Sequence, residues 1–115
     1  MAADAKYLLV TIKDVDPNNE EDYAKWMGEE HMPDLLTVPG VIRALRYVSR
    51  DGSSPRHMAI YELERADIPD SQEWEHAAHS ERTKYMAARW QSKARNIFEL
   101  VEVVTPSGAK RAIRR

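Results

Sequence analysis

The sequence predicts one small α+β domain whose elements follow the order β-α-β-β-α-β. Three observations support this fold class. The chain has 115 residues, which fits a single domain. It contains four short segments rich in strand-forming residues, and two longer segments with helical spacing separate them. A core of this size is small, so burial against a second copy of the chain would stabilise it.

The first strand and the first helix are expected in the first third of the chain. Residues 7–12 read YLLVTI and predict a buried strand. Asp16-Pro17 offers a helix N-cap followed by a proline at the first helical position, so a helix is predicted over 17–31. Pro33 should interrupt this helix, because its ring disfavours a helical residue before it and removes a backbone donor. A short turn then leads to Pro39-Gly40.

The remaining elements form a hairpin, a helix and a last strand. Strands are predicted over 41–49 and 57–63, with Asp51-Gly52 in the loop that joins them as an antiparallel pair. A second helix is predicted over 70–90, and a fourth strand over 97–104. The packed face of that second helix is expected to carry Trp74, Ala77, Ala78, Glu81, Tyr85 and Ala88.

This order is the ferredoxin-like arrangement, in which two helices cover one face of a four-stranded antiparallel sheet. Alternate positions of the strands make the opposite face apolar as well, so we expect a homodimer that buries it. The domain is predicted over residues 1–106. Residues 107–115 are expected to form a basic, solvated tail that carries Lys110, Arg111, Arg114 and Arg115.

Composition excludes several functions. The net charge of -2 is spread in both signs, which argues against nucleic-acid binding. The absence of cysteine excludes disulfides, thiolate zinc sites and cysteine nucleophiles. No signal-peptide profile and no apolar run of about 20 residues occurs, so a cytoplasmic protein without a membrane segment is expected. Phosphate-binding glycine loops and a serine-hydrolase elbow are absent too.

Two local patterns resemble a known superfamily. One is Trp26-x4-His31-x-Pro33-x-Leu35-x3-Pro39-Gly40-Val41, and the other is Tyr61-Glu62-Leu63-Glu64 followed by a helix with Trp74, His76 and His79. The chain resembles the dimeric α/β-barrel superfamily, in particular its EthD-like proteins, and is similar to antibiotic-biosynthesis-monooxygenase-like proteins. The resemblance implies a cavity in each subunit, between sheet and helices, suited to a small hydrophobic ligand.

His31 and His79 are the candidate catalytic residues. The unperturbed pKa of histidine lies near neutrality, so His31 can donate and accept protons from its position at a helix end. A second interpretation of His31 is a helix-end residue that hydrogen-bonds the last carbonyl groups. The resemblance implies that His79 reaches the cavity rim, whereas a solvated helix face is its other interpretation. His76 and His79 share a helix face, but without further ligands we expect no metal site.

Six further residues are candidate substrate-binding groups. Tyr61 and His57 lie on one face of the third strand, and either could line the cavity. An arginine that faces the cavity could hold a carboxylate or enolate, although an ion pair is its other interpretation. The remaining candidates are the aromatic residues Trp26 and Trp74 and the pair Arg43 and Tyr47 on the second strand.

The leading hypothesis is a small cofactor-independent enzyme that uses histidine acid–base chemistry on a hydrophobic aromatic or polyketide-like molecule. The reaction would be of lyase, dehydratase, cyclase or isomerase type, with His31 as general acid or base. One alternative is a monooxygenase, either cofactor-free or linked to haem. Another is a non-catalytic dimeric module for ligand binding or stress response.

Overall fold

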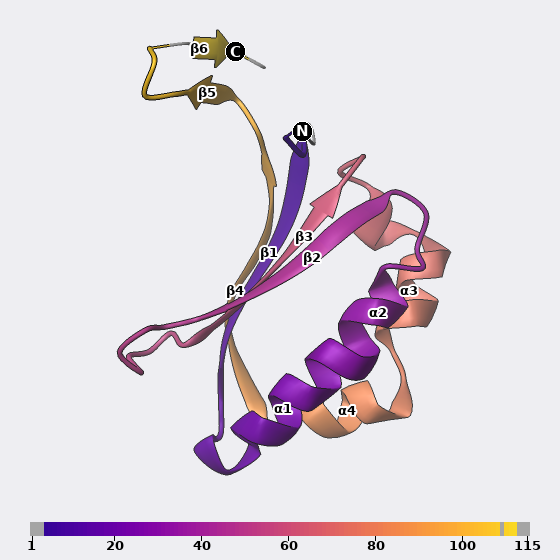
Figure 1. Cartoon of the computed structure of the whole chain (residues 1–115). Helices are drawn as coiled ribbons and strands as arrows, with labels where there is room; N and C mark the ends of the chain where they lie inside the picture. The colour runs from indigo at the N-terminus through magenta and orange to yellow at the C-terminus, as the bar shows by residue number, and fades with distance from the viewer. Residues whose placement is uncertain (1–3, 109, 113–115) are drawn as a thin grey trace.

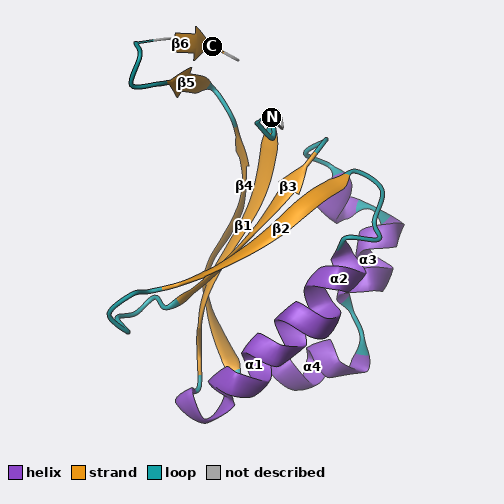
Figure 2. Ribbon diagram, in the orientation of Figure 1, coloured by secondary structure: helices purple, strands orange, loops and turns teal. Residues whose placement is uncertain are grey.

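The fold is α+β and ferredoxin-like, as predicted. In the computed structural model, which describes residues 4–108 and 110–112, four antiparallel strands form one sheet in the order β2-β3-β1-β4. All helices lie against one face of this sheet (Figures 1 and 2). The strands are β1 (Tyr7–Val15), β2 (Val41–Val48), β3 (His57–Leu63) and β4 (Trp90–Glu99).

The helices fall into two groups along the chain. A short 3₁₀ turn, Pro17–Asn19, leads into α1 (Glu20–Trp26), a π turn (Met27–His31) and α2 (Met32–Leu35). A second 3₁₀ turn, Ile68–Asp70, precedes α3 (Gln72–Ala78) and α4 (Glu81–Ala87). In the part of the chain that the structure describes, no helix has the length and apolar character needed to cross a membrane.

The predicted interruption at Pro33 does not occur. The helical path continues from α1 through Met27–His31 into α2, and Pro33 occupies the first turn of α2. Proline is tolerated in a first turn, and the wider π turn before it relieves the clash between the proline ring and the preceding carbonyl groups. The backbone N–H of Met32 donates to the carbonyl of Met27, five residues earlier, as a π turn requires.

The prediction of one helix over 70–90 is wrong, because a new helix begins at Ser80 within the segment. The Ser71 side chain accepts from Trp74 N and caps α3, and the Ser80 side chain accepts from Thr83 N and caps α4. Between them His79 leaves the helical conformation. The break rotates the second half, so Met86 is buried there while the predicted core positions Glu81, Tyr85 and Ala88 are exposed.

The fourth strand begins earlier than predicted and ends earlier. β4 covers Trp90–Glu99 and pairs with β1, although most of its first half is polar and exposed. The chain then leaves the sheet, and β5 (Glu102–Val104) pairs with β6 (Lys110–Ala112) in a hairpin that stands apart from the helices (Figure 1). Lys110 and Arg111 of the predicted tail belong to β6, and Arg114 and Arg115 lie outside the described residues.

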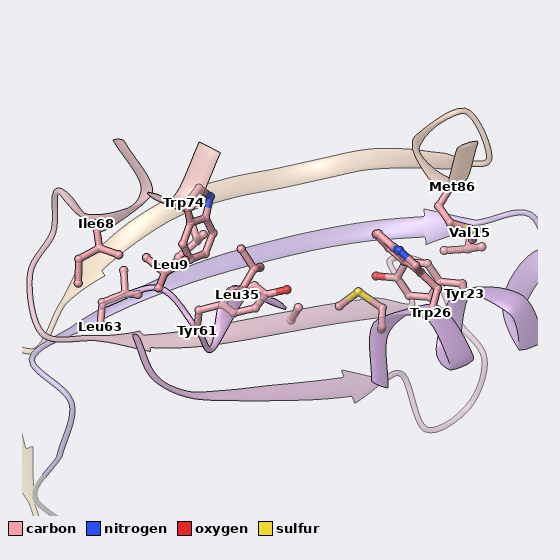
Figure 3. Close-up of a cluster of buried hydrophobic side chains, with 13 residues drawn as sticks. Leu9, Val15, Tyr23, Trp26, Leu35, Tyr61, Leu63, Ile68, Trp74 and Met86 are labelled. Atoms are coloured by element: carbon pink, nitrogen blue, oxygen red, sulfur yellow. The ribbon is translucent and has the colours of Figure 1, made fainter. Parts of the chain in front are cut away.

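The core lies between the sheet and the helices. The inward positions of β3, namely His57, Ala59, Tyr61 and Leu63, are all buried, which confirms the predicted alternation of that strand. Figure 3 shows the core along its length, from Leu63, Ile68 and Trp74 at one end to Tyr23, Trp26 and Met86 at the other.

The opposite face of the sheet is apolar and is not covered by a helix (Figure 2). Its positions follow from the strand register, in which Ile12 pairs with Met58 and Leu45 pairs with Ile60. Phe98 on β4 remains 51% exposed. We call the face that carries Leu8, Val10, Ile12, Leu45, Tyr47, Met58, Ile60 and Phe98 the outer sheet face.

Candidate functional site

A cavity of about 240 Å³ lies between the helices and the inner face of β1 and β4. Its walls combine apolar and aromatic side chains with at least as many polar or charged ones, so it can hold a small molecule that carries polar groups. The lining residues are Leu9, Thr11, Lys13, His31, Leu35, Tyr61, Trp74, Ala78, His79, Thr83, Trp90, Ser92 and Arg95. The volume lies just below the range typical of drug-sized ligands, so it favours a molecule of one or two fused rings.

The imidazole of His31 forms part of the cavity wall. Its ring stacks on the indole of Trp26, with centroids 4.4 Å apart and planes inclined by 22°. Trp26 in turn stacks on Trp90 at 5.6 Å. This aromatic stack holds the imidazole from behind, and the π turn that ends at His31 directs it toward the sheet.

The environment of His31 keeps its ring neutral at pH 7. Burial lowers the pKa of His31 to about 4, with smaller contributions from the nearby Lys13 and His79. Among the described residues, neither ring nitrogen of His31 has a hydrogen-bond partner. A neutral imidazole carries one unprotonated nitrogen, so His31 is available to accept a proton from a bound molecule.

Two cationic side chains, Lys13 and Arg95, face the same cavity. The ammonium of Lys13 lies 3.9 Å from the ring centroid of Trp90, a cation–π contact that positions it. Burial, with a smaller contribution from the charge of Arg95, lowers the pKa of Lys13 to about 8. Lys13 therefore remains mostly protonated at pH 7, and the cavity has a positive side.

His79 lies at the cavity rim, where α3 ends. Its Nδ1 lies 2.9 Å from the carbonyl oxygen of Glu75, and since a carbonyl only accepts, Nδ1 donates this hydrogen bond. In the neutral ring Nε2 is then an acceptor. The side chain is 56% exposed, so His79 has access to both solvent and a bound ligand.

Three of the predicted aromatic residues lie at or behind the cavity wall. Tyr61 and Trp74 line it and meet edge to face, with centroids 5.6 Å apart. Burial raises the pKa of the Tyr61 phenol, which keeps it protonated. Trp26 does not line the cavity but supports His31.

His57 lies elsewhere and makes a structural contact. Its ring is 4% exposed, and Nε2 donates to the Glu20 carboxylate at 2.8 Å. Arg56 Nε donates to the same oxygen at 2.6 Å. These hydrogen bonds, first the one from Arg56 and then the one from His57, hold the pKa of the Glu20 carboxyl below its usual value. They tie the start of α1 to the start of β3 rather than forming a ligand contact.

Arg43 and Tyr47 also lie away from the cavity. The guanidinium of Arg43 makes two hydrogen bonds of 3.0 Å with the Glu62 carboxylate on the neighbouring strand. Tyr47 is 50% exposed on the outer sheet face. The structure therefore places His31, His79, Tyr61 and Trp74 together and leaves the two β2 residues on the opposite side of the sheet.

Sequence reasoning missed Lys13 and Arg95. Lys13 continues the inward positions Leu9 and Thr11 of β1, so a longer first strand with strict alternation would have identified it. Arg95 was missed because the fourth strand was expected to begin two residues after it. Among the described residues, no group of three His, Cys, Asp or Glu side chains could hold a metal ion.

Comparisons with known proteins give structural likeness alone. HapK from Hahella chejuensis superposes with a TM-score of 0.62 at 6% identity, over 82% of this chain and 91% of HapK. An EthD family protein from Bacillus halodurans superposes with a TM-score of 0.61 at 14% identity, over 83% of this chain and 98% of that one. The chain shares the fold of these two proteins. No family model and no curated protein matches the sequence.

A third solved structure has the same fold. It is a conserved protein of unknown function from Bacteroides thetaiotaomicron, described as a "Possible Oxidoreductase". Its TM-score is 0.61 at 15% identity, over 85% of this chain and 100% of that chain. At such identities the likeness shows the fold alone and carries no specific chemistry.

Proposed function

We propose that this protein is a small enzyme that catalyses proton transfer on a hydrophobic aromatic or polyketide-like molecule, with His31 as the general base. The observation that carries the proposal is the state of His31. Its imidazole lines a cavity with apolar, aromatic and polar walls, stays neutral at pH 7 and has no hydrogen-bond partner among the described residues. An idle, oriented and neutral base in a small-molecule cavity is the arrangement that general base catalysis requires.

The proposed step is removal of an acidic C–H proton. The unprotonated nitrogen of His31 accepts the proton, and the electron pair of the broken C–H bond moves into an adjacent carbonyl group to give an enolate. The imidazolium can return the proton to another carbon, which is an isomerisation. It can instead protonate a departing hydroxyl group, which is a dehydration. His79 at the rim offers a second acid–base group for this proton.

The proposed chemistry needs no cofactor, because imidazole alone carries the proton. Haem is the alternative cofactor, and His79 would be its candidate ligand on the cavity side. The cavity volume of about 240 Å³ favours a small ring system over a group as large as haem.

The proposed assembly is a homodimer formed through the outer sheet face. This face carries exposed aromatic residues, with Tyr47 at 50% and Phe98 at 51% exposure. A continuous apolar surface of this kind is costly in water, and pairing through a two-fold axis would bury it.

Deuterium exchange tests the proposed function without knowledge of the natural substrate. The probes are apolar cyclic ketones and lactones with acidic C–H groups, 2-tetralone among them, in D₂O at pD 7. The purified protein should accelerate deuterium incorporation into at least one probe, as followed by proton NMR. His31→Gln should lower that acceleration by about two to four powers of ten, the usual contribution of a general base.

The matched control is His76→Gln. His76 is exposed on α3 and does not line the cavity, so its replacement should leave the rate unchanged. Equal rates for the wild type and His31→Gln would remove His31 from the mechanism. Absence of acceleration for every probe would favour the non-catalytic binding module.

A further inference from the structure

The cations beside His31 bear on what the cavity binds. We infer that the ligand of this cavity is an anion, an aromatic or other apolar acid whose carboxylate or phenolate lies between Lys13 and Arg95. This inference rests on the proposed function only in using the same cavity, and it adds the chemical class of the molecule.

The strand register brings the two cations together. Thr11 on β1 pairs with Arg95 on β4, and Lys13 pairs with Ser92. Lys13 and Arg95 therefore point to the same inner face as diagonal neighbours across the two strands, within reach of one small ligand. The hydroxyl groups of Thr11 and Ser92 lie on the same wall and offer further donors to an anion.

Neither cation is neutralised within the described part of the chain. No ion pair forms at Lys13 or Arg95, and no aspartate or glutamate lines the cavity. Two like charges that face one partly buried space repel each other, and this repulsion adds to the larger effect of burial in lowering the pKa of Lys13. A bound anion would remove the repulsion, since it would pair with both cations.

The bulge between β1 and β4 separates Lys93 from Lys13 and Arg95, which line the cavity. Ile12 pairs with Ala94 and Lys13 pairs with Ser92, so Lys93 is the extra residue of β4. Its ammonium lies 3.8 Å from the Asp14 carboxylate, away from the cavity lining. Lys93, which lies outside the cavity, therefore has a carboxylate partner. Lys13 and Arg95, which line the cavity, have no carboxylate partner among the described residues.

An anion in this place would also improve His31 as a base. Burial holds the pKa of His31 well below neutrality, and the charge of Lys13 makes a smaller contribution in the same direction. A carboxylate or phenolate beside Lys13 would offset that charge and raise the pKa of His31 toward the working pH, where proton transfer is most efficient. An anionic substrate would thereby activate the base that acts on it.

Two isosteric probes test the inference. Binding of 2-naphthoate and of the neutral 2-naphthamide is measured by calorimetry and by quenching of tryptophan fluorescence. Naphthoate should bind at least about tenfold more tightly than naphthamide, because it makes charge-assisted contacts that the amide lacks. Lys13→Met and Arg95→Met should each reduce this ratio, and the double variant should bring it close to one. Circular dichroism verifies that the variants are folded.

Lys93→Met is the matched control, because Lys93 is a strand lysine with its own carboxylate partner. It should keep the wild-type ratio within about twofold. Equal binding of the two probes, failure of both to bind at millimolar concentration, or a ratio that survives in the double variant would overturn the inference.

The outcomes also separate this inference from the proposed function. If naphthamide binds as tightly as naphthoate and deuterium exchange depends on His31, the anionic ligand is refuted and the proposed catalytic function stands. If naphthoate is preferred, the preference depends on Lys13 and Arg95, and no deuterium exchange is accelerated, the cavity is an anion-binding site without catalytic activity.

Discussion

The low pKa of His31 predicts that the stability of this protein falls as the pH drops below 6.5. The ordinary pKa of histidine, 6.5, applies to the unfolded chain, whereas burial lowers it to about 4 in the folded chain. Between these values the unfolded chain binds more protons than the folded chain, so the free energy of unfolding decreases with decreasing pH. This loss of unfolding free energy is nearly absent above pH 6.5 and complete below about pH 4.

The size of the effect follows from the two pKa values. Their separation corresponds to about 3.4 kcal/mol when the effect is complete, because one pKa unit is worth about 1.36 kcal/mol. About 2 kcal/mol of this is lost between pH 7 and pH 5. That amount is a large share of the stability of a small domain, which is about 5–15 kcal/mol.

Urea unfolding followed by tryptophan fluorescence measures this loss. The free energy of unfolding is determined at pH 7, 6 and 5 for the wild type and for His31→Gln. Other groups titrate in both proteins, so the difference between the two curves isolates His31. The wild type should lose about 2 kcal/mol more than His31→Gln from pH 7 to pH 5.

The exposed His76 provides the control. His76→Gln should follow the wild-type curve, because this residue lies outside the cavity. The reasoning fails if the difference between the wild type and His31→Gln changes by less than about 0.5 kcal/mol over this range. It fails equally if the NMR signal of the His31 ring titrates near pH 6.5.

Two further predictions concern the fold and the assembly. Gly40 has φ +92°, and a Cβ there would meet the Ile68 side chain, whereas Gly52 has φ +81° with open space around it. Gly40→Ala should therefore lower the free energy of unfolding by about 1–2 kcal/mol more than Gly52→Ala, and equal losses in urea unfolding would contradict the packing argument. Ile60→Glu places a charge on the outer sheet face and should convert the proposed dimer to a monomer in sedimentation velocity. A wild type that sediments as a monomer would refute that assembly.

The order of the elements was predictable because it depends on local signals. The strands at Tyr7, Val41 and His57 begin where apolar, β-branched and aromatic residues gather, and the structure places all three there. The ends of the elements were less predictable. A serine at position 80 can cap a helix or lie within one, and the helical pattern around it did not distinguish the two.

The candidate site was predictable only where one segment carried the signal. His31 was selected because it lies two residues before Pro33, where the first helix was predicted to end, and because it matches the His-x-Pro of the resemblance. The helix continues past it, but the side chain does line the cavity. His57 gave a similar signal, but its partner Glu20 lies 37 residues away, and that pairing exists only in the folded chain. Arg95 was missed because the first half of β4, at the sheet edge, is too polar to be recognised as a strand.

The π turn between Trp26 and His31 has a consequence for how this protein could diverge. Successive residues of an α-helix are rotated by about 100°, and a π turn accommodates one residue more than an α turn does. Loss of a single codon within Met27–Glu30 would restore a regular helix, in which Trp26 and His31 become residues i and i+4 and remain neighbours on one face. The stack of Trp26 on the imidazole can therefore form with or without the π turn. A one-residue deletion in this helix is thus a change that this protein could tolerate, because it would leave the support behind His31 in place.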